Sequence, residues 1–142
     1  MQCAVKLDVK GNLEKVRNTE DLPTLDFIYR NVECSFYEEV HACGLKEGYF
    51  LAVNEEGLFA EKPFINPIAS WLYGFHEHGQ PIVGNALIMK IVYTEDGPDT
   101  GFLEEHEADL LISWLLERRP IMIRDMRSAL VNYGLDFIVE KS

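Results

Sequence analysis

Apolar and polar residues alternate in several short stretches of this chain, as they do in half-buried β-strands. In residues 2–9, Cys3, Val5 and Leu7 fall on one side of an extended chain, and Lys6 falls on the other. We therefore expect a sheet to form much of the fold. The same alternation, or a dense apolar run, predicts further strands at residues 34–41, 49–53, 81–93 and 135–139.

The most apolar of these stretches, residues 81–93, is rich in Ile and Val. Nearly continuous apolarity is typical of a central strand that is buried on both faces of a sheet. The residues that follow, 94–101, are partly acidic and contain Gly97 and Pro98. Because glycine and proline interrupt regular structure, this segment predicts a surface loop.

A first helix is indicated between two of the strands. Leu25, Ile28 and Val32 recur at the spacing of one helical face. Thr24 stands just before them and can cap the helix through its hydroxyl. The pattern therefore predicts a short helix over residues 25–31.

A second short helix is predicted to begin after Asn66. The Asn66 side chain can accept a hydrogen bond from the first turn, and Pro67 suits the first helical position because that position needs no N–H donor. Gly74 can end the helix, since glycine adopts the left-handed conformation that follows many helices.

The carboxy-terminal region predicts two helices. In residues 103–119 the apolar residues share one face, acidic residues fill the first turns, and arginines occupy the last turn. Pro120 is expected to end this helix or begin the next one, which covers residues 121–133 and stops at Gly134. Together the elements predict an α+β fold: a single domain over residues 1–142, with a mixed or antiparallel sheet packed against helices and a carboxy-terminal helical pair.

The chain is strongly acidic, with 13 Lys and Arg residues against 24 Asp and Glu residues and a net charge of −11. This charge repels nucleic-acid phosphates, so no direct nucleic-acid binding is expected. It favours an acidic surface that docks on a partner protein with a basic surface. No apolar run reaches the length of a membrane-spanning helix, and three cysteines without an amino-terminal signal segment predict a cytoplasmic protein with no membrane partner.

Several residues suited to catalysis or metal binding are present, but they form no known motif. His76 with His78, and His41 with Cys43, could each face one ion. Neither pair has the spacing of a structural zinc site or an evident third ligand. Nucleophile and phosphate-binding motifs are absent from the sequence. The sequence therefore predicts no enzyme, no metal and no cofactor.

Polar residues at the junctions of predicted elements form a candidate ligand site. Asn54, Asn66 and Asn85 can each donate and accept hydrogen bonds, and turn and cap roles explain them equally. Glu55 follows Asn54 in the same turn, and Trp71 offers an aromatic face to a planar ligand. These five residues are the candidate ligand-binding residues, and a nucleotide-like molecule is the ligand they would suit.

The basic residues are concentrated in the predicted carboxy-terminal helices. Arginines at helix ends complement the helix dipole without any ligand, and Glu117 and Asp125 can pair with them. A structural role is therefore favoured over an anion-binding patch. The arginines concerned are Arg118, Arg119, Arg124 and Arg127.

Three short motifs occur in this order along the chain: Asn54-Glu-Glu-Gly57, Asn66-Pro-Ile-Ala69 and Ile82-Val-Gly-Asn85. They resemble a domain-of-unknown-function family of small acidic proteins from phages and integrative mobile elements of Gram-positive bacteria. The resemblance covers about residues 34–107 and leaves a helical extension at about 108–142. It implies an α+β fold and an accessory role in a mobile element, and it supplies no catalytic residues.

Two functions are therefore expected. The first is a non-enzymatic accessory protein that acts by protein interaction through an acidic surface, in an anti-defence or regulatory role. The alternative is a protein that binds or sequesters a small nucleotide-like ligand. Exposed faces on the two terminal helices would also suit a homodimer.

Overall fold

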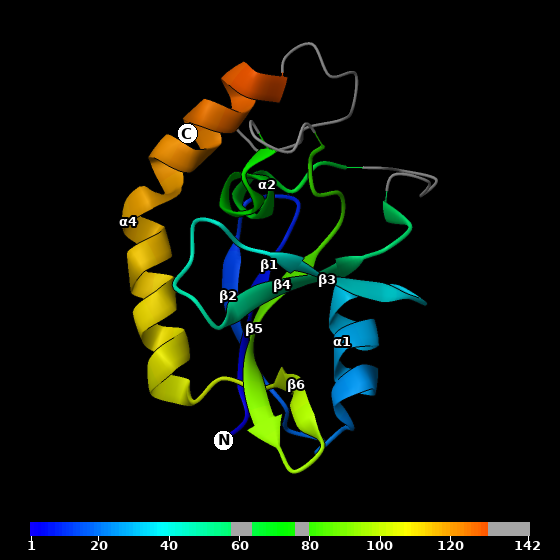
Figure 1. The fold of residues 1–142 in the computed structure, drawn as a ribbon. Helices are drawn as coiled ribbons and strands as arrows, with labels where there is room; N and C mark the ends of the chain where they lie inside the picture. Colours follow the sequence, from blue (N-terminus) through cyan, green and yellow to red (C-terminus); the bar gives the residue numbers. More distant parts are fainter. Residues whose placement is uncertain (58–63, 76–79, 131–142) are drawn as a thin grey trace.

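The computed structural model describes residues 1–57, 64–75 and 80–130. Within them, six strands form one antiparallel sheet with helices on both of its faces (Figure 1), which confirms the predicted α+β fold. The sheet order is β2-β1-β5-β4-β3, and β6 pairs with the second half of β5. The elements are β1 (Cys3–Leu7), β2 (Leu13–Arg17), α1 (Thr24–Val32), β3 (Tyr37–His41), β4 (Tyr49–Asn54), α2 (Pro67–Tyr73), β5 (Ala86–Thr94), β6 (Gly97–Gly101) and α4 (Glu105–Leu130).

The two faces of the sheet carry different helices. Alternate residues of the central strands point to opposite faces, so Leu51 on β4 packs toward α2 and α4, whereas Ala52 packs toward α1. On the α1 face, Phe27 and Ile28 are buried against Phe50 of β4 and its neighbours. Burial of side chains of this size stabilises the fold by about 1.5–3 kcal/mol each.

Helix α2 forms as its local sequence predicts. The Asn66 side chain accepts a hydrogen bond from the Ala69 N–H at 3.0 Å, Pro67 takes the first helical position, and Gly74 ends the helix at φ 86°. The Ser70 hydroxyl also accepts a hydrogen bond from the Ile82 N–H at 2.9 Å. Helix α2 is therefore joined to the chain that leads into β5.

The segment after β5 differs from the predicted surface loop. Residues Gly97–Gly101 form β6, which pairs with β5 over Lys90–Thr94 through a tight turn. Gly97 adopts a φ of 107°, which only glycine reaches without strain and which lets the chain reverse there. The expectation that the whole of 81–93 is buried is also wrong, because burial on both faces ends at Met89.

The predicted carboxy-terminal helical pair is one continuous helix. Helix α4 runs for 26 residues and contains Pro120. Met122 and Met126, which follow the proline, are buried against the rest of the protein, and this packing holds the helix together past it. Strand β2 was not predicted, because Leu13–Arg17 alternates only weakly. The strand expected at 135–139 lies outside the described residues.

No helix in the described part of the chain is both long and apolar enough to cross a membrane.

Candidate functional site

A pocket of about 280 Å³ opens beside α2 where β3 begins and β4 ends, and we call it the β3–β4 pocket. Its polar lining comes from two strands, the turn after β4 and the end of α2. Apolar side chains of β3, β4 and the segment before β5 form its floor. The lining residues are Glu38, Val40, Val53, Asn54, Glu55, Gly57, Tyr73, Gln80, Pro81, Ile82 and Val83.

Strand register explains why Glu38 faces this pocket. Glu38 pairs with Val53, and directly paired residues of an antiparallel ladder point to the same face of the sheet. Val53 packs into the core on the α2 and α4 face, so Glu38 lies on that face at its exposed margin. Glu39, one residue later, points to the opposite face and accepts a hydrogen bond from Thr100 of β6.

Two of the five candidate ligand-binding residues line this pocket. Asn54 ends β4, and its side-chain oxygen accepts a hydrogen bond from the Glu56 N–H at 3.0 Å. Glu55 follows it in the turn and is exposed. Together they place an amide and a carboxylate at the pocket. The Asn54 side-chain oxygen already accepts a hydrogen bond within its own turn.

Asn66 is fully buried and is saturated by the protein itself. Its side-chain nitrogen donates to the carbonyl oxygens of Leu7 at 2.8 Å and Gly84 at 3.0 Å. Its oxygen accepts from the Ala69 N–H. This side chain therefore joins α2 to β1 and to the chain before β5, and it has no group left for a ligand.

Trp71 and Asn85 lie away from the β3–β4 pocket. Trp71 packs beside Ile65, Phe75 and Met126, which fixes α2 against α4. The Asn85 side chain donates to the Glu33 carboxylate at 2.9 Å, at the exposed end of α1. The structure thus gathers Asn54 and Glu55 at one pocket and gives the other three candidates separate contacts.

The histidine and cysteine pairs are only partly described. His76 and His78 lie outside the described residues. Among the residues that are described, no group of three or more His, Cys, Asp or Glu side chains is placed to hold a metal ion. Cys34 is half-buried, and burial raises the pKa of its thiol while a hydrogen bond to the backbone of Phe36 opposes the rise. A raised pKa makes this thiol a poor nucleophile.

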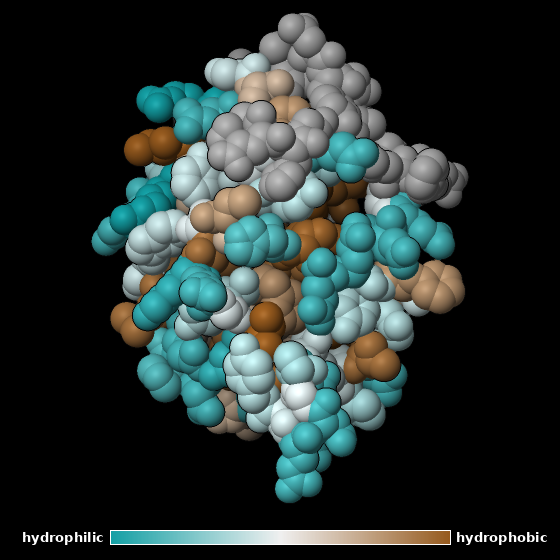
Figure 2. All heavy atoms as spheres, in the orientation of Figure 1, coloured by the Kyte–Doolittle hydropathy of each residue, from teal (hydrophilic) through white to brown (hydrophobic). Residues whose placement is uncertain are grey.

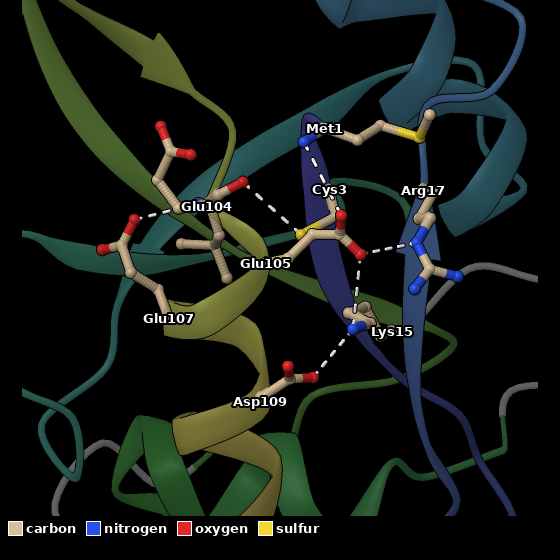
Figure 3. A network of polar contacts seen from close by, with 9 residues as sticks. Met1, Cys3, Lys15, Arg17, Glu104, Glu105, Glu107 and Asp109 are labelled. Carbon is tan, nitrogen blue, oxygen red and sulfur yellow. Dashed lines mark hydrogen bonds and ion pairs between the residues drawn. The ribbon is translucent and has the colours of Figure 1, made fainter.

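Carboxylates near the start of α4 are paired with cations (Figure 3). Arg17 of β2 donates to Glu105 at 2.6 Å, and Lys15 donates to Asp109 at 2.8 Å. The amino group of Met1 also lies 3.7 Å from Glu105. The hydrogen bond from Arg17 lowers the pKa of Glu105. These contacts link the start of α4 to β2 and pair Glu105 and Asp109 with cations.

A second polar cluster connects α4 to the middle of the sheet. Glu107 accepts hydrogen bonds from Lys90 of β5 at 2.6 Å and from the Tyr49 hydroxyl of β4 at 3.0 Å. Burial raises the pKa of Tyr49, and its hydrogen bond to Glu107 adds to the rise. Sequence reasoning missed this cluster, because no local signal connects residues that are 17 and 58 positions apart.

In the region from Glu33 to Gly57, by contrast, carboxylates far outnumber cations. This region contains six glutamates and one cation, Lys46. Within the described residues, no salt bridge involves any of these glutamates. Those placed at β3 and at the turn after β4 are exposed: Glu38, Glu39, Glu55 and Glu56. We call these four residues the β3–β4 carboxylates.

The arginines Arg118, Arg119 and Arg124 do not lie at a helix end as predicted, because α4 runs on to Leu130 and the helix dipole therefore does not account for them. Arg118 and Arg124 do pair with the expected carboxylates. They lie 3.6 Å from Glu117 and 3.5 Å from Asp125, respectively. Arg118 also stacks over Trp114, with 4.2 Å between the guanidinium carbon and the ring centre. Arg118 therefore contacts its own helix, and Arg119 donates to the carbonyl oxygen of Gly11 at 2.6 Å.

Comparisons with protein-family models, with curated proteins and with solved structures found no match to this chain.

Proposed function

We propose that this protein is a non-enzymatic accessory protein of a mobile element that acts in the cytoplasm by binding a partner protein with a basic surface. The binding surface is formed by the β3–β4 carboxylates. The observation that carries the proposal is the uneven charge pairing: Glu105, Glu107 and Asp109 at the start of α4 are paired with cations, while the β3–β4 carboxylates have no salt bridge within the described residues.

Carboxylates that lack a salt bridge and lie at one edge of a sheet suit a basic partner. They create a negative potential that attracts lysine and arginine side chains over several ångströms and speeds association at low salt. Exposure of the edge strand β3 also leaves room for a partner, and the adjacent glutamates hinder unwanted pairing with another strand. The resemblance to proteins of phages and mobile elements supports an anti-defence or regulatory setting.

Charge reversal tests this proposal. The double variant Glu38→Lys with Glu55→Lys changes two exposed side chains that line the pocket. Glu14→Lys with Glu95→Lys gives the same change in net charge at exposed positions of β2 and the β5–β6 turn. Partner capture from cells that carry the parent element, at low and at high salt, is then compared with the unchanged protein.

The proposal predicts that the pocket variant loses the partner and that the matched variant keeps it. Capture by the unchanged protein should also weaken as salt rises, because salt screens exposed charges. If both variants retain the partner equally, or if the unchanged protein retains it at high salt, the β3–β4 carboxylates do not form the binding surface.

A second candidate function is favoured by the composition of the β3–β4 pocket. Asn54, Tyr73 and Gln80 place amide and phenol groups beside apolar side chains, as in many small-ligand sites. The described lining includes two carboxylates and no Lys or Arg. It therefore suits an uncharged ligand such as a nucleoside better than a nucleotide with its phosphates. Thermal stabilisation by nucleosides, lost in Asn54→Ala, would support this candidate, and no stabilisation across a nucleoside and nucleotide panel would remove it.

A further inference from the structure

Helix α4 carries apolar residues outside its buried face. Leu110 is 69% exposed and Ile121 is 51% exposed. Trp114 lies between them at helical spacing and is half-buried. We call these three residues the α4 stripe. Large apolar side chains in a row on one helix face are typical of an interaction surface.

Helix α4, which carries the stripe, lies at the outer edge of the molecule (Figure 1). Figure 1 shows α4 along one side of the sheet, and Figure 2 shows hydrophobic residues among hydrophilic ones on that side. A groove of about 430 Å³ adjoins the stripe. It is lined by Leu110, Leu111 and Trp114 of the helix and by Tyr49 and Lys46 on the sheet side, together with His106 and Glu107. An apolar side chain from another molecule would fit there.

The charges along α4 are divided between its two halves. From Glu104 to Glu117 the helix and its approach contain five carboxylates and no Lys or Arg. From Arg118 to Leu130 they contain four arginines and one carboxylate, Asp125. Glu105, Glu107 and Asp109 are already paired with Arg17, Lys90 and Lys15. Glu117 is exposed beside Arg118 where the two halves meet, and an identical helix packed in the antiparallel direction about this point would place each Glu117 beside the Arg118 of the other copy. A two-fold interface requires a surface that is complementary to itself in this way.

We propose that the α4 stripe binds a second copy of this protein, with the two α4 helices antiparallel about a two-fold axis between Glu117 and Arg118. In this register Trp114 of each copy faces Ile121 of the other, and Ile121 enters the groove. Glu117 of each copy faces Arg118 of the other. The 26-residue helix is about 39 Å long, so two copies can contact each other over several helical turns.

A second copy fits this surface better than the basic partner proposed above. That partner requires unpaired carboxylates, whereas the stripe is apolar and is flanked by both signs of charge. The Glu117 side chain is 78% exposed and the Arg118 side chain 41% exposed, so both can contact another molecule. The self-association is independent of the β3–β4 carboxylates and can be tested separately from them.

Measurement of molar mass in solution over a range of concentrations tests this inference. The unchanged protein should be a dimer at micromolar concentration, and Ile121→Glu should be a monomer. Leu116→Glu is the matched control, because Leu116 is 55% exposed on a different side of the same helix and its variant should remain a dimer. Circular dichroism confirms that both variants are folded.

Charge exchange tests the register. Glu117→Arg alone and Arg118→Glu alone should each weaken the dimer at least tenfold, because like charges then face each other twice. An equimolar mixture of these two variants should form a heterodimer, since both contacts become attractive again. Arg118→Lys should keep the dimer and separate the effect of charge from that of stacking on Trp114.

Three results would overturn the inference. The first is a monomer at all concentrations. The second is a dimer that survives Ile121→Glu, because another surface would then hold it. The third is a monomer whose Ile121 is needed to capture a different protein, which would assign the stripe to that protein.

Discussion

Lys90 on β5 donates a hydrogen bond of 2.6 Å to Glu107 on α4, and this contact joins the longest helix to the central strand. Both side chains are mostly buried, with 28% and 19% of their surfaces exposed. Glu107 is also bonded to Tyr49 on β4 and to its own helix start through the Glu104 N–H at 2.9 Å. One carboxylate thus fixes α4 relative to two neighbouring strands.

Glu107→Gln is expected to destabilise the protein at neutral pH by about 1–2 kcal/mol, because its hydrogen bonds lose a negatively charged acceptor and Lys90 loses its opposite charge. Burial raises the pKa of Glu107, but the hydrogen bonds from Lys90, the Glu104 N–H and Tyr49 together outweigh it, so the pKa is lowered. A carboxyl group with a lowered pKa contributes stability above its unfolded value, and that contribution is lost as the pH falls through the folded value.

The difference between Glu107→Gln and the unchanged protein should therefore shrink in acid. Urea unfolding at neutral pH and at a pH below the folded pKa measures it. Glu47→Gln is the control, since it removes one exposed carboxylate from the loop before β4 and should change stability little. A constant difference across the pH range would mean that packing rather than charge is responsible.

Asn66→Ala is expected to destabilise the protein by about 2–4 kcal/mol. The change leaves the Leu7 and Gly84 carbonyls and the Ala69 N–H without their partner. Each buried polar group left unsatisfied costs about 1–3 kcal/mol, and these costs are not fully additive. Denaturant midpoints measure the loss.

Asn85→Ala provides the comparison for Asn66, because Asn85 makes one exposed hydrogen bond, to Glu33. Its effect should stay within about 0.5 kcal/mol. Equal effects at the two positions would contradict the view that Asn66 has a structural role. Loss of ligand binding in Asn66→Ala without a loss of stability would contradict it as well.

The sequence predicted those features whose signals lie within a few residues. The cap at Asn66, the stop at Gly74 and the helix beginning near Leu25 each depend on neighbours in the chain. The predicted cap at Thr24 is wrong, because Thr24 lies within α1 and no side chain caps the start of that helix. Asn54 and Glu55 lie together at the pocket for the same reason, since they share one turn.

Features fixed by distant contacts were missed. The segment Gly97–Gly101 has little intrinsic preference for a strand and becomes one by pairing with β5. The side-chain nitrogen of Asn66 finds its acceptor in Leu7, 59 positions away, so its role could not be read from its surroundings in the sequence. The acidic composition was evident, but the pairing of some carboxylates and not others depends on where Lys15, Arg17 and Lys90 lie.

Gly101→Ala is expected to destabilise the protein by about 1–3 kcal/mol through crowding. A Cβ at Gly101 would overlap the side chain of Val92 on the paired strand β5. Thermal unfolding measures the effect. Val92→Ala should relieve the crowding, so the double variant should be more stable than Gly101→Ala alone. If the double variant gained nothing, the glycine would be required for another reason.

Pro120→Ala is expected to stabilise the protein by about 1–2 kcal/mol. Alanine restores the N–H that proline lacks in the middle of α4 and removes the clash of the ring with the preceding turn. Part of this gain is offset, because proline also limits the freedom of the unfolded chain. Pro120 is exposed, so no core contact is lost.

Denaturant unfolding of Pro120→Ala and of Pro98→Ala checks this prediction. Pro98 is exposed on β6, outside any helix, and its replacement should change stability little. If Pro120→Ala destabilised the protein instead, the local geometry at the proline would be what brings Met122 and Met126 to the core. The proline would then be part of how α4 is fitted to the sheet.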